Sequence, residues 1–76
     1  MATDKPVKYL GWIYIQKSKG FTDAFYVMPI GEKSRYVGNG DQGAQAAVDF
    51  FDKLAGKPVK LDDSMGFLGL RAYIED

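Results

Sequence analysis

Apolar and polar residues alternate along the first half of the chain, in three runs at positions 9–17, 24–30 and 35–38. Each run is rich in aromatic and β-branched residues, which favour strands. Polar or glycine-containing segments separate the runs, and the segment 31–34 is short enough for a hairpin turn. The pattern therefore predicts three consecutive antiparallel strands.

Successive side chains of a strand point to opposite faces of a sheet, so each run divides into two sets. One set is mainly aliphatic and is predicted to face a helix: Ile13, Ile15, Phe25, Val27 and Val37. The other is mainly aromatic and is predicted to form an outer face: Leu10, Trp12, Tyr14, Gln16, Tyr26, Met28 and Tyr36. A shift of the pairing by one residue would exchange the two faces.

Helical spacing of apolar residues follows at positions 42–55. The predicted buried stripe consists of Ala44, Ala47, Val48, Phe51, Leu54 and Ala55. Asp41 or Asn39 is the predicted N-cap, and Gly56 suits the position just after the helix. Gly43 is a weak point in the first turn, because glycine disfavours helix.

The tail at positions 65–74 alternates again and is predicted to form a fourth strand. If the side with Leu68, Leu70, Ala72 and Ile74 meets the helix, then Phe67, Arg71 and Tyr73 extend the outer face. Alternatively, the tail folds over that face. The expected fold is a single α+β domain over residues 1–76, with a flexible leader at 1–7. A three- to four-stranded antiparallel sheet carries one helix on one face, in the order β-β-β-α-β.

Composition argues against an enzyme. The chain has no cysteine and no histidine, so thiol catalysis, disulfides and the commonest general base are excluded. Asp62-Asp63 is interpreted as a solvated loop, because two adjacent carboxylates without further ligands are weak evidence for a metal. No catalytic residue, metal site or cofactor is predicted. No apolar run reaches the ~18 residues of a membrane span, and a cytoplasmic location is expected.

The net charge is zero but unevenly spread. Residues 1–38 hold six Lys and Arg against three Asp and Glu, whereas residues 39–76 hold four against seven. We therefore predict that the outer face binds DNA, with aromatic rings stacking on bases and cations holding phosphates. The predicted contacts are Trp12, Tyr14, Lys17, Lys19, Tyr26, Lys33, Arg35 and Tyr36. The alternatives are an accessory or inhibitor protein of a phage or mobile element that binds a protein partner, a homodimer, or ring pairing that only stabilises the sheet.

Several short motifs resemble the DNA-binding domains of ethylene-response factors and the amino-terminal domains of phage-type integrases. They are Tyr9-Leu10-Gly11-Trp12, Arg35-Tyr36-Val37-Gly38 and Ala47-Val48-Asp49-Phe50-Phe51-Asp52. The resemblance implies three strands that enter a DNA groove. Leu10 stands where that family has arginine, which argues against sequence-specific readout of guanine. Lys33-Ser34-Arg35, with the segment 48–54, also resembles PUR-type repeats, which bind single strands.

Overall fold

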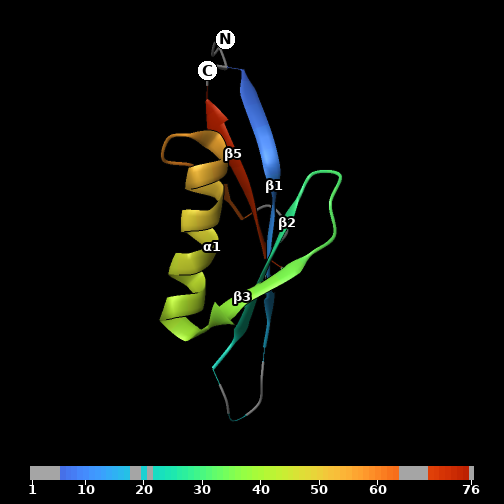
Figure 1. Ribbon diagram of the computed structural model, residues 1–76, viewed down its shortest axis with the longest axis vertical. Helices are drawn as coiled ribbons and strands as arrows, with labels where there is room; N and C mark the ends of the chain where they lie inside the picture. Colours follow the sequence, from blue (N-terminus) through green and yellow to red (C-terminus); the bar gives the residue numbers. More distant parts are fainter. Residues whose placement is uncertain (1–5, 18–19, 21, 64–68, 76) are drawn as a thin grey trace.

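The structure is a computed structural model that describes residues 6–17, 20, 22–63 and 69–75. Strands β1 (Val7–Gln16), β2 (Ala24–Pro29) and β3 (Arg35–Asn39) precede helix α1 (Gly40–Ala55), and β4 (Lys60–Asp62) and β5 (Gly69–Glu75) follow it. The strands form one antiparallel sheet in the order β3-β2-β1-β5-β4. Figure 1 shows α1 lying along one side of this sheet. The fold is α+β, as predicted.

The first three strands and the helix lie within two residues of their predicted bounds. Strand β4 was not predicted, and Asp62 belongs to it instead of to a loop. The described part of the tail is β5, which pairs with β1 and β4 and does not fold over the outer face. Val7, the last residue of the predicted flexible leader, belongs to β1 instead, because it pairs with Glu75. Phe67 and Leu68 lie outside the described residues.

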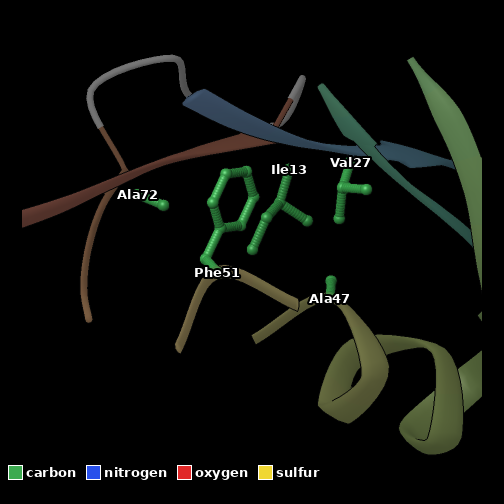
Figure 2. Close-up of a cluster of buried hydrophobic side chains, with 5 residues drawn as sticks. All are labelled: Ile13, Val27, Ala47, Phe51 and Ala72. Atoms are coloured by element: carbon green, nitrogen blue, oxygen red, sulfur yellow. The ribbon is translucent and has the colours of Figure 1, made fainter. Parts of the chain in front are cut away.

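The core lies between the sheet and α1 and is small. Its buried members are Ile13, Val27, Ala47, Phe51 and Ala72. Figure 2 shows Phe51 reaching from α1 towards the sheet beside Ile13. Burial of such a side chain contributes roughly 1.5–3 kcal/mol. Phe25, Val37 and Leu70 are partly buried against this cluster, which confirms the predicted interior set apart from Ile15. Ile15 is also partly buried but is not among the residues packed against the cluster.

A β-bulge in β1 corrects the predicted position of Leu10. Tyr9 pairs with Tyr73 and Gly11 pairs with Ala72, so β1 has one residue more than β5 between these pairs. Leu10 packs against the core cluster and not on the outer face. Tyr9 instead joins the outer face, with its ring centroid 5.8 Å from that of Tyr73.

Two of the three buried positions of α1 are small residues, which lets the helix approach the sheet closely. Gly43, Ala47 and Phe51 are its buried positions, and Leu54 of the predicted stripe is 52% exposed. Asn39 is the N-cap residue, but its side chain makes no capping bond. It accepts a hydrogen bond from the Tyr36 hydroxyl and donates one to the Thr22 carbonyl. Gly56 ends the helix in the left-handed conformation, as expected for this position.

Candidate binding surface

The sheet surface opposite α1 is an array of aromatic side chains, here called the outer aromatic face. It comprises Tyr9, Trp12, Tyr14, Tyr26, Met28, Tyr36 and Tyr73, from four neighbouring strands. Within the described parts of the chain, α1 is the one element outside the sheet, and it lies on the other side (Figure 1). No described element therefore covers the rings, although most of them are partly buried by their neighbours in the sheet.

The strand register places these rings in contact with one another. Tyr14 pairs with Tyr26, and Tyr26 pairs in turn with Tyr36. The Tyr26 and Tyr36 centroids are 5.6 Å apart with the rings edge to face. Such pairs stabilise a sheet. Tyr36 nevertheless stays 55% exposed and Tyr9 39% exposed, so pairing alone does not remove their apolar surface from water.

Two cations at the β4–β5 end of this face are paired with carboxylates. The Arg71 guanidinium lies 4.7 Å from the Tyr9 ring centroid, and its Nη2 is 3.0 Å from an Asp62 carboxylate oxygen. Lys60 forms an ion pair with Glu75. Its hydrogen bond to the Glu75 carboxylate, and the charge of that group, raise the pKa of Lys60 above its ordinary value. These two ion pairs together carry no net charge at pH 7.

Two of the three predicted phosphate contacts that the structure describes are paired with carboxylates. Lys17 is paired with Asp23, at 3.0 Å between Nζ and Oδ2, and Lys33 is exposed in the turn before β3. Lys19 lies outside the described residues. Arg35 lies on the helix side, with its guanidinium 5.4 Å from the Phe50 ring centroid and 3.5 Å from Glu32. Arg35 is therefore not part of the outer aromatic face.

The four predicted aromatic contacts, Trp12, Tyr14, Tyr26 and Tyr36, are brought together on one face. Arg71 and Tyr73 extend it, as expected from the alternation of the tail. Tyr9 was missed, because the bulge reverses its side. Gly11 was the available signal, since a glycine within a strand often marks a bulge.

Neither a candidate metal-binding cluster nor a candidate membrane-spanning helix is found in the described ranges. These residues contain no group of three or more His, Cys, Asp or Glu side chains that could hold a metal ion. No described helix has the length and apolar character needed to cross a membrane.

Comparison with protein-family models, curated proteins and solved structures gives no match to this chain. The resemblances to ethylene-response-factor, integrase and PUR-type domains therefore stay predictions.

Proposed function

We propose that this protein is a small non-enzymatic binding module whose outer aromatic face docks onto a partner protein. The observation that carries the proposal is that rings left open by the described elements share their face with Arg71 and Lys60, two cations already paired to carboxylates. Trp12, Tyr36 and Tyr73 supply the residue types that dominate the energy of protein interfaces. Depletion of unpaired charge is typical of the centre of such interfaces.

Single-stranded DNA is the second candidate ligand. The specific observation in its favour is that several rings are displayed side by side on one open sheet, a surface on which bases can stack at about 1–3 kcal/mol each. Nucleic-acid binding also needs cations, because much of its free energy comes from release of counterions. Of the predicted phosphate contacts that the structure describes, Lys17 and Arg35 are paired with carboxylates and Lys33 is not. A DNA strand would therefore find few free cations among these residues.

The experiment is a selection of binders from a displayed peptide library, followed by affinity measurements on two matched variants. Tyr36→Ala removes a 55% exposed ring from the outer aromatic face, and Leu54→Ala removes a 52% exposed side chain from α1. We expect binders to lose at least tenfold in affinity with Tyr36→Ala and to be unaffected by Leu54→Ala. Circular dichroism checks that both variants are folded.

Salt dependence and self-association complete the test. Peptide affinity should change less than about threefold between about 50 and 200 mM salt, whereas DNA affinity would fall log-linearly. Oligonucleotide binding with that steep fall, abolished by Tyr36→Ala, would replace a partner protein with DNA. A dimer abolished by the same variant in ultracentrifugation would assign the face to a second copy of the chain. Binders lost with Leu54→Ala and not with Tyr36→Ala would overturn the proposal.

A further inference from the structure

A hollow of about 430 Å³ opens beside the paired rings of Tyr14 and Tyr26. Ile15, Gln16 and Ser34 complete its lining. Its volume falls within the roughly 300–1,000 Å³ of sites that bury small organic groups. Two of its lining residues carry phenol rings, which favour an apolar or aromatic occupant.

The polar groups of the hollow are neutral and oriented. The Tyr26 hydroxyl donates a hydrogen bond to Gln16 Oε1 at 3.2 Å. This bond directs the carbonyl end of the Gln16 amide towards Tyr26, which leaves the amide NH₂ to donate to an incoming acceptor. The Ser34 hydroxyl both donates and accepts. No charged residue is among the described residues that line the hollow, so a charged occupant would gain no ion pair from this lining.

We infer that this hollow is the anchor site for an aromatic side chain of the partner protein, with a neighbouring peptide carbonyl accepting from Gln16. The inference rests on the proposed function and names the group that the outer aromatic face takes. Buried aromatic anchors in pockets contribute much of the binding energy of protein interfaces.

A nucleobase shares the planar shape and the hydrogen-bond acceptors of this occupant. It brings a phosphate with it, however, and no charged residue is among the described residues of the lining. Of the two described cations next to lining residues in the sequence, Lys17 is paired with Asp23 and Lys33 is exposed in the turn before β3. The neutral lining itself favours a neutral peptide over a nucleotide.

The test is an NMR titration of the full chain with N-acetyltryptophanamide, which carries an indole ring and two neutral amides. N-acetylglycinamide, which has the amides without a ring, and adenosine are the comparison probes. We expect N-acetyltryptophanamide to shift the amide resonances of Tyr14, Gln16, Tyr26 and Ser34, with neither comparison probe binding as tightly.

Two variants and two controls locate the binding. Gln16→Ala should weaken it about 2- to 10-fold, the loss expected for one neutral hydrogen bond. Gln45→Ala is the matched control, because Gln45 also makes a side-chain hydrogen bond, to Asp49, but on α1. Ser34→Phe should fill the hollow and abolish binding, whereas Ser34→Ala should leave it nearly unchanged.

The outcomes separate this inference from the proposed function. Peptide binding that depends on Tyr36, with no N-acetyltryptophanamide binding at the hollow, overturns the anchor and leaves the proposed function standing. Probe binding at the hollow without any peptide binding to the outer aromatic face overturns the proposed function instead. Tighter binding of adenosine, or equal losses with Gln16→Ala and Gln45→Ala, also overturns the anchor.

Discussion

Gly43 in the first turn of α1 packs directly on the backbone of Gly38 in β3. A Cβ atom added to Gly43 would lie 2.4 Å from the carbonyl carbon and the carbonyl oxygen of Gly38. This approach brings the start of the helix onto β3, an edge strand of the sheet. Because the backbone of α1 touches the backbone of β3 here, the position of α1 across the core depends on the absence of a side chain at residue 43.

Gly43→Ala is therefore expected to destabilise the protein, although alanine favours helix by about 1 kcal/mol. Overpacking against the β3 backbone costs typically about 1–3 kcal/mol, and more where backbone must move. Urea denaturation measures the difference. Gln42→Ala, at an exposed neighbouring position, is the control and should change the free energy of unfolding by less than about 0.5 kcal/mol. A stabilised Gly43→Ala variant would contradict the described contact.

Truncation of Phe51 and truncation of Leu54 should have very different effects on the free energy of unfolding. Phe51 is fully buried against Ile13 and Val27, and Leu54 is half exposed. Phe51→Ala should cost about 3–5 kcal/mol. That is a large part of the ~5–15 kcal/mol that stabilises a typical domain.

Leu54→Ala should lower the free energy of unfolding by less than about 1 kcal/mol, because truncating an exposed side chain creates no cavity in the core. Thermal denaturation followed by circular dichroism compares the two variants. Equal losses would show that the helix presents a different stripe to the sheet.

The contact between Arg71 and Asp62 ties β5 to the short strand β4. Both side chains are about one-third exposed, and Arg71 also lies over the Tyr9 ring. A double-mutant cycle with Arg71→Gln and Asp62→Asn should give a coupling energy of about 0.5–1.5 kcal/mol. The coupling should shrink in high salt, since solvent reaches the pair. Strict additivity of the two substitutions would contradict an energetic contact between these groups.

Alternation and helical spacing were sufficient to predict the main elements and the side of the sheet on which most rings lie. Ile13 and Trp12 illustrate this, because one is buried against α1 and the other pairs with Met28 on the outer aromatic face. Strand β4 was missed because three residues are too few to show a period. Asn39 was correctly one of two predicted N-caps, but its side chain bonds to Tyr36 and Thr22 through tertiary contacts that spacing does not encode.

Arg35 was predicted as a phosphate contact because it stands at a strand end, although alternation places it on the same side as Val37. Val27 pairs with Arg35 across β2 and β3, so the guanidinium follows Val27 to the helix side. Bulges are decided by packing and twist over several strands, which is why Leu10 was expected on the other face.

Trp12 is the single tryptophan of the chain and lies on β1, in the centre of the outer aromatic face. Its fluorescence therefore tests the central claim most directly, in a titration with a selected peptide that lacks tryptophan. If the outer aromatic face binds the partner, Trp12 emission will shift to shorter wavelength and acrylamide quenching will fall as the complex forms. A saturated complex in which Trp12 emission and quenching equal those of the free protein would contradict it.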